Sequence, residues 1–214
     1  MPAPRRITAL EPDPRRPGAV RVLVDGRPWC TLAAEDAGRA GLAVGAELDP
    51  ARAARAGLAA DAESAYRAVL RSLERRAFAT ADLRRRLVRR GHPPEAVDQA
   101  LARARAARLL DDESFACQFV ETRARRGRGP ARLRRDLLAL GLDREVIERA
   151  LAAAWPEGGD PDGLPRQLAR KRAQELGDVP RAVKLRRLLA YLARRGWSGP
   201  AVTAMARRIV AGDG

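Results

Sequence analysis

Three groups of residues in this chain of 214 residues carry side chains that could do chemistry. His92 is the only histidine, and no Ser, Cys or Asp is arranged around it as a nucleophile and base would be. The acidic run at residues 111–113 precedes Ser114 and Phe115, which favours a helix N-terminus over a metal site because consecutive carboxylates project in different directions. Residues 127–129, Gly-Arg-Gly, lack the preceding strand and following Lys-Ser or Lys-Thr of a phosphate-binding loop. We therefore expect no enzyme activity, metal or cofactor.

The two cysteines indicate a reducing compartment. Cys30 and Cys117 are isolated, without the short Cys or His spacing of a zinc site or the pairs of a disulfide framework. No apolar run approaches the length that spans a bilayer, and the Pro- and Arg-rich start lacks the apolar centre of a signal peptide. The sequence therefore predicts a soluble, cytoplasmic protein.

The charge indicates an anionic partner. The formal net charge is +15, and so much positive potential attracts polyanions such as nucleic acid or an acidic protein groove. All basic residues except Lys171 and Lys184 are arginine. A GC-rich coding sequence accounts for that preference, but it does not account for the excess of positive charge.

The composition predicts small helical units. Aromatic residues make up only 4% of the chain, and Ala, Leu, Arg and Glu, all good helix formers, dominate it. The exception is residues 1–60, where strands at 19–24 and 27–32 are joined by an Asp-Gly turn and a strand at 7–10 can pair alongside. A short helix at 35–41 follows. We predict a small β-hairpin module here.

An internal repeat sets the architecture of the rest. Residues 83–91, 133–141 and 188–196 share one pattern that starts with Leu and ends with Gly, and an apolar helix resumes after each Gly. The fold class is therefore mainly α, a tandem array of three three-helix repeats that we expect to be elongated and curved. The predicted repeats span residues 61–110, 111–155 and 164–214. The breaker-rich linker at 156–163 predicts hinge freedom before the third repeat.

Local signals place the ends of several helices. Thr80 is a candidate N-cap of the second helix of the first repeat, and Gly91 supplies a left-handed residue at its end. In the second repeat Pro130 suits the start of a helix and Asp143 the cap of the next, which should stop at Trp155.

Charge is unequal among the repeats: residues 63–110 carry 12 basic and 5 acidic residues, residues 111–154 carry 9 and 8, and residues 164–210 carry 12 and 2. The second helix of each repeat is basic, as is the loop before it in the second repeat. One such run is usually solvated surface, but three at matching positions can line one side of an array. The candidate partner- or DNA-binding residues are Arg84, Arg85, Arg89, Arg90, Arg126, Arg128, Arg132, Arg134, Arg135, Arg186, Arg187, Arg194 and Arg195.

Several kinds of partner remain open on these residues alone. No aromatic residues are interleaved with the arginines, which argues against base stacking with a single strand. Sequence-specific binding of duplex DNA by a helix-turn-helix stays an alternative, although Pro93, Pro94 and Glu95 occupy the place of base-reading side chains. A structural adaptor for an acidic protein is a second alternative.

Residues 75–83, with Leu87 and Gly91 after them, resemble the first-repeat signature of the RecX family. Residues 109–116 and 137–142 resemble its most recognisable stretch. Residues 191–198 are similar to its third repeat, with Trp where Phe is more usual. The opening hairpin is also of the family's kind, so the resemblance covers nearly the whole chain.

This resemblance implies a monomeric negative regulator of homologous recombination, DNA repair and the SOS response. Its partner would be the RecA recombinase filament on DNA, in whose helical groove it would lodge, inhibiting ATPase and strand exchange and promoting disassembly. Weak, nonspecific binding of single-stranded or duplex DNA is also implied, and no membrane. The nearly neutral second repeat departs from the family, and it suggests that the first and third repeats carry the contact.

Overall fold

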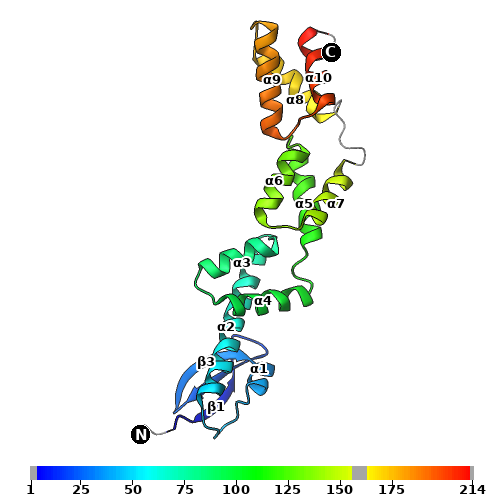
Figure 1. Cartoon of the computed structure of the whole chain (residues 1–214). Helices are drawn as coiled ribbons and strands as arrows, with labels where there is room; N and C mark the ends of the chain where they lie inside the picture. Colours follow the sequence, from blue (N-terminus) through cyan, green and yellow to red (C-terminus); the bar gives the residue numbers. More distant parts are fainter. Residues whose placement is uncertain (1–3, 156–162, 213–214) are drawn as a thin grey trace. The chain divides into compact units, whose positions relative to one another are not determined.

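The computed structural model describes residues 4–155 and 163–212, which form a three-stranded sheet and ten helices (Figure 1). The chain divides into two compact units, Met1–Leu110 and Asp111–Gly214. The mainly helical fold class predicted from the repeat is confirmed. None of the helices in the described ranges is long and apolar enough to cross a membrane.

The first unit opens with an antiparallel sheet of β1 (Ile7–Pro12), β2 (Ala19–Val24) and β3 (Arg27–Ala33), in that order. Asp25 and Gly26 connect β2 to β3 with φ of 50° and 77°. Positive φ at both central residues suits the twist of a two-residue hairpin. The predicted hairpin and its neighbouring strand are confirmed.

Two helices follow the sheet. The first, α1 (Ala34–Arg39), confirms the short helix predicted at residues 35–41. The second, α2 (Pro50–Leu73), starts with Pro in its first turn, and the Asp49 carboxylate accepts a hydrogen bond from the Arg52 N–H at 2.7 Å. This cap satisfies a backbone donor that has no partner within the helix.

Helix α2 belongs to both modules of the first unit, because it runs through the boundary expected at residue 60. Near its start, Ala56 is fully buried in the core that contains Leu32 of the sheet. Two to four turns later, Ala65 and Val69 are fully buried in the core of the first repeat. One continuous helix therefore fixes the sheet against the first repeat.

The first repeat consists of the C-terminal part of α2 with α3 (Thr80–Arg89) and α4 (Pro94–Ala106). Its core includes Leu83, Leu87, Val97, Ala100, Leu101 and Ala104. The predicted role of Thr80 as an N-cap is wrong: Ala79 holds the cap position, and its carbonyl accepts the first helical bond, from Leu83 N at 3.0 Å. The helix thus begins one residue earlier than the polar side chain suggested.

The second repeat contains α5 (Asp112–Ala124), α6 (Pro130–Leu140) and α7 (Arg144–Ala154). Asp111 and Asp143 cap α5 and α7 by accepting backbone hydrogen bonds at 2.9 to 3.0 Å, which confirms both predicted caps. The buried side chains include Phe119, Val120, Leu133, Leu137, Ile147 and Leu151.

The third repeat, predicted to span residues 164–214, contains α8 (Leu164–Glu175), α9 (Arg181–Arg195) and α10 (Pro200–Ala211). Its core includes Ala169, Leu188, Leu192, Trp197, Val202, Met205 and Ala206. Trp155 is the C-cap of α7, as predicted. The expected linker at 156–163 lies outside the described residues except for its last position.

The second helix of every repeat ends in the same way. Gly91, Gly141 and Gly196 have φ of 91°, 86° and 94°, and the residue after each glycine donates its N–H to a carbonyl five residues earlier. The pairs are His92 and Leu87 (3.3 Å), Leu142 and Leu137 (3.3 Å), and Trp197 and Leu192 (2.9 Å). This Schellman motif needs a left-handed residue, which glycine adopts without a steric penalty.

Candidate partner-binding surface

One of the predicted arginines of the first repeat forms an ion pair with another helix of the same repeat. Arg84 on α3 donates through Nε and Nη2 to the two carboxylate oxygens of Asp98 on α4, at 2.7 and 2.8 Å. These hydrogen bonds, with the charge attraction, hold the pKa of Asp98 below its usual range and raise the pKa of Arg84. The bidentate ion pair fastens α3 to α4.

The same ion pair recurs in the second repeat. Arg134 on α6 donates to both carboxylate oxygens of Glu148 on α7, at 2.6 and 2.7 Å, and lowers the pKa of Glu148. Both partners lie 50 residues after their counterparts in the first repeat. The third repeat has Leu189 and Thr203 at the matching positions, so the pair is absent there.

Three more of the predicted arginines are paired with acidic side chains. Arg128 and Arg132 both bind Asp136, at 2.9 and 3.0 Å, and Arg85 lies 3.5 Å from Asp82. Sequence reasoning missed these carboxylates and those of the bidentate pairs. The spacing of 14 residues between arginine and acid, present in two successive repeats, is a signal that could have found the latter.

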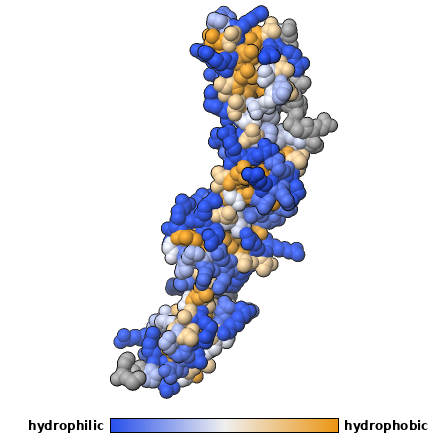
Figure 2. Space-filling model, in the orientation of Figure 1, coloured by the Kyte–Doolittle hydropathy of each residue, from blue (hydrophilic) through white to orange (hydrophobic). Residues whose placement is uncertain are grey.

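Seven of the predicted arginines are exposed and have no acidic partner among the residues that the structure describes. We call them the unpaired arginines: Arg89, Arg90, Arg126, Arg135, Arg186, Arg187 and Arg194. Their charge is available to a partner without the loss of an internal ion pair. Large apolar side chains contribute little to the exposed surface: those exposed in the described ranges are Val44, Leu109 and Leu138. Hydrophilic residues dominate the visible surface of each unit (Figure 2).

Two of the repeats present unpaired arginines at equivalent places. Arg89 and Arg90 immediately precede Gly91 at the end of α3, and Arg194 is the counterpart of Arg89 at the end of α9. The second repeat has Ala139 and Leu140 at these positions. The second repeat therefore has no arginine at the end of its second helix, in agreement with its nearly neutral net charge.

Arg195, the remaining candidate, joins the second and third repeats within the second unit. Its Nη1 donates to the Arg126 carbonyl at 3.3 Å, and its backbone carbonyl accepts from Gly129 N at 2.8 Å. The buried Trp197 donates Nε1–H to the Gly127 carbonyl at 3.1 Å. These bonds oppose the hinge freedom that the linker predicted between the two repeats.

Glycine is required at this junction because the two backbones are in direct contact. A Cβ on Gly129 would lie 2.5 Å from the Gly196 carbonyl oxygen, and one on Gly196 would lie 2.4 Å from Arg132 N. Trp155 and Trp197 pack edge to face beside it, with ring centroids 5.8 Å apart. The sequence signal for this junction was Trp197, at a position where Phe is more usual, because only the indole ring has an N–H that can donate to the Gly127 carbonyl.

Two residues considered for chemistry, Asp111 and Cys30, have shifted pKa values with local causes. The pKa of Asp111 is lowered by hydrogen bonds from the Ser114 backbone and hydroxyl, which belong to its capping role. Burial raises the pKa of the Cys30 thiol to about 11, so that it stays protonated at neutral pH. Across the described ranges, no three His, Cys, Asp or Glu side chains group in a way that could hold a metal ion. What the surface offers a partner is positive charge and hydrogen-bond donors.

Fold and surface together define a class: proteins in which tandem three-helix repeats follow a small β-sheet module and display unpaired arginines. Residues 65–103 match the first three-helix domain of RecX, and residues 111–151 match the second. The chain belongs to the RecX family.

Solved structures agree with this fold. A crystal structure of regulatory protein RecX is 24% identical with a TM-score of 0.77, over 96% of this chain and 98% of that chain. The crystal structure of RecX from Lactobacillus salivarius is 18% identical with a TM-score of 0.61, over 70% of this chain and 96% of that chain. No curated protein sequence matches the chain.

Proposed function

We propose that this protein is a negative regulator of homologous recombination and DNA repair that binds the RecA–DNA filament in its helical groove. Bound there, it inhibits ATP hydrolysis and strand exchange and promotes disassembly. The observation that carries the proposal is the recurrence of exposed, unpaired arginines on the second helices of a RecX-family repeat fold.

Electrostatics supports a filament as the partner. A nucleoprotein filament presents phosphates and acidic side chains in a repeating pattern, which tandem repeats can contact at several points. The first and third repeats carry most of the positive charge. Contact of both repeats with the filament is therefore favoured over contact of one repeat alone. A regulator that contacts two neighbouring subunits binds some of their relative arrangements better than others, and it thereby restrains the motions that ATP turnover needs.

The test measures ATP hydrolysis by RecA on single-stranded DNA while the purified protein is added. Inhibition at substoichiometric or equal ratios is expected, and it should weaken with salt because charge carries the contact. Unchanged hydrolysis at every salt concentration contradicts the proposal. A strong preference for one duplex sequence that persists in high salt would favour a helix-turn-helix DNA-binding protein instead.

A further inference from the structure

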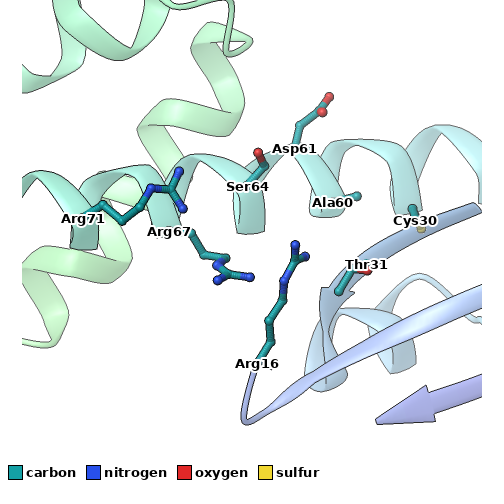
Figure 3. A pocket seen from close by; sticks show the side chains of 8 residues that line it. All are labelled: Arg16, Cys30, Thr31, Ala60, Asp61, Ser64, Arg67 and Arg71. Atoms are coloured by element: carbon teal, nitrogen blue, oxygen red, sulfur yellow. The ribbon is translucent and has the colours of Figure 1, made fainter. Parts of the chain in front are cut away.

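A cavity of about 400 Å³ opens between α2 and the sheet of the first unit, and three arginines line it (Figure 3). Arg16 comes from the loop between β1 and β2, whereas Arg67 and Arg71 come from α2, one turn apart. The volume lies within the range of small-ligand sites, roughly 300 to 1,000 Å³. None of these three arginines is among the partner-binding candidates on the second helices of the repeats.

The positive charges in this cavity are only partly neutralised by the protein. Within the described ranges neither Arg67 nor Arg71 forms an ion pair, and Arg16 makes one, through Nε to Asp13 at 3.4 Å. The carboxylate of Asp61, at the edge of the cavity, points away from the guanidinium groups of Arg16 and Arg67, which extend toward each other (Figure 3). Arg67 and Arg71 stand at the i,i+4 spacing of one helix, at which like charges repel each other.

Neutral donors complete the lining. Ser64 and Thr31, each with a hydroxyl group, also line the cavity. Cys30 adds no negative charge, because its thiol stays protonated at neutral pH. Guanidinium groups present planar pairs of N–H donors that match the oxygens of a phosphate, and hydroxyl groups can donate to the remaining oxygens.

We propose that this cavity is a phosphate-binding site for one phosphoryl group, held by Arg16, Arg67 and Arg71. That group can belong to a free phosphate or nucleotide, or to the backbone of a nucleic acid. The site lies between the N-terminal sheet module and the part of α2 that belongs to the first repeat, and it does not depend on binding to a recombinase filament. It would relieve the repulsion among the three guanidinium groups, so occupancy should stabilise the fold.

The test compares the wild-type chain with Arg67→Gln/Arg71→Gln and with the control Arg55→Gln/Arg75→Gln. The control removes the same charge outside the cavity, at Arg55 in the second turn of α2 and at Arg75 just beyond the C-cap of that helix. Circular dichroism and the thermal midpoint in chloride establish that each variant is folded. Should the double variant unfold, Arg71→Gln alone, at an exposed position, and Arg67→Lys take its place.

Two probes distinguish the sources of the phosphate. Inorganic phosphate at constant ionic strength should raise the thermal midpoint of the wild type and control, and not of the cavity variant. Binding of an oligothymidylate, followed by fluorescence anisotropy, should lose about 0.7 in its log–log salt slope for each contact removed, if the backbone is the ligand. Loss of the phosphate response alone assigns the site to a free phosphate or nucleotide, and loss of oligonucleotide affinity beyond the control assigns it to the backbone. Equal responses of the cavity variant and the control to both probes would overturn the proposal.

Discussion

Arg84 and Asp98 form two parallel hydrogen bonds between the second and third helices of the first repeat. The equivalent residues of the second repeat, Arg134 and Glu148, do the same. Arginines that look alike along the chain therefore have two different roles. Those opposite a carboxylate on the third helix hold the repeat together, and those at the helix end remain available to a partner.

Replacing the acid of the second ion pair should weaken the repeat slightly. For Glu148→Gln we expect a loss of less than about 1 kcal/mol in the free energy of unfolding, because the pair is largely exposed and solvent screens it. Urea unfolding of this variant, Arg134→Ala and the double variant forms a double-mutant cycle. A coupling energy of zero would show that the ion pair does not stabilise the repeat.

The same pairs predict how stability responds to acid. The pKa of Asp98 is lower in the folded chain than its ordinary value of 3.8, so its contribution is fully present above pH 5. It is lost as the pH falls below about 4 and the folded-state carboxylate becomes protonated. Unfolding in urea between pH 3 and 7 should show a shallower acid dependence for Asp98→Asn than for the wild type. Parallel profiles would contradict the assignment.

Alanine at Gly196 should disrupt the junction of the second and third repeats. The left-handed conformation penalises any side chain by about 1 to 2 kcal/mol, and here the Cβ would also overlap the Arg132 backbone. Gly91→Ala is the matched control, because Gly91 has a similar φ and open space around the added Cβ. We expect Gly196→Ala to lose at least about 2 kcal/mol more than the control. Equal losses in urea unfolding would mean that the junction is not close-packed in solution.

Phenylalanine at position 197 tests the hydrogen bond of the junction separately from its packing. Trp197→Phe keeps an aromatic ring but leaves the Gly127 carbonyl without its indole donor, so we expect a loss of about 1 to 3 kcal/mol. Proteolysis should become faster at the same time. The variant Trp155→Phe changes the partner ring, whose indole N–H donates to no atom of the residues that the structure describes, and it should lose less.

Charge reversal at the helix ends tests the proposed surface. Arg89→Glu/Arg90→Glu and Arg194→Glu should each raise the concentration for half-inhibition of RecA ATP hydrolysis by roughly tenfold, because repulsion replaces attraction. Arg144→Glu, an exposed change in the nearly neutral second repeat, is the control. If it inhibits as poorly as the helix-end variants, net charge and not this surface determines binding.

A comparison of two neighbouring arginines separates their roles. Arg84→Gln removes a residue that Asp98 already holds, whereas Arg89→Gln removes one without an acidic partner, from the same helix. The second variant should weaken inhibition more, and the first should affect stability more. The reverse order would assign partner contact to the ion-paired residues.

Local chemistry made much of the fold predictable from the sequence. The Asp25-Gly26 turn, the caps at Asp111 and Asp143, and the glycines at the ends of the second helices each depend on backbone conformations that a few neighbouring residues determine. The repeat was readable because its copies share that local chemistry. The prediction of Thr80 as an N-cap was wrong because the preceding Ala79 occupies the cap position through its backbone alone.

Tertiary structure decided which arginines are free, and it brought Gly129 against Gly196. Spacing along a helix identifies a solvent-facing side chain, but whether a carboxylate stands opposite it depends on how a second helix packs. The sequence likewise did not predict that α2 contributes to two cores, because each half of the helix has an ordinary apolar face. The sequence by itself therefore determined the repeats and their arginines, whereas packing between distant segments determined which arginines a partner can use.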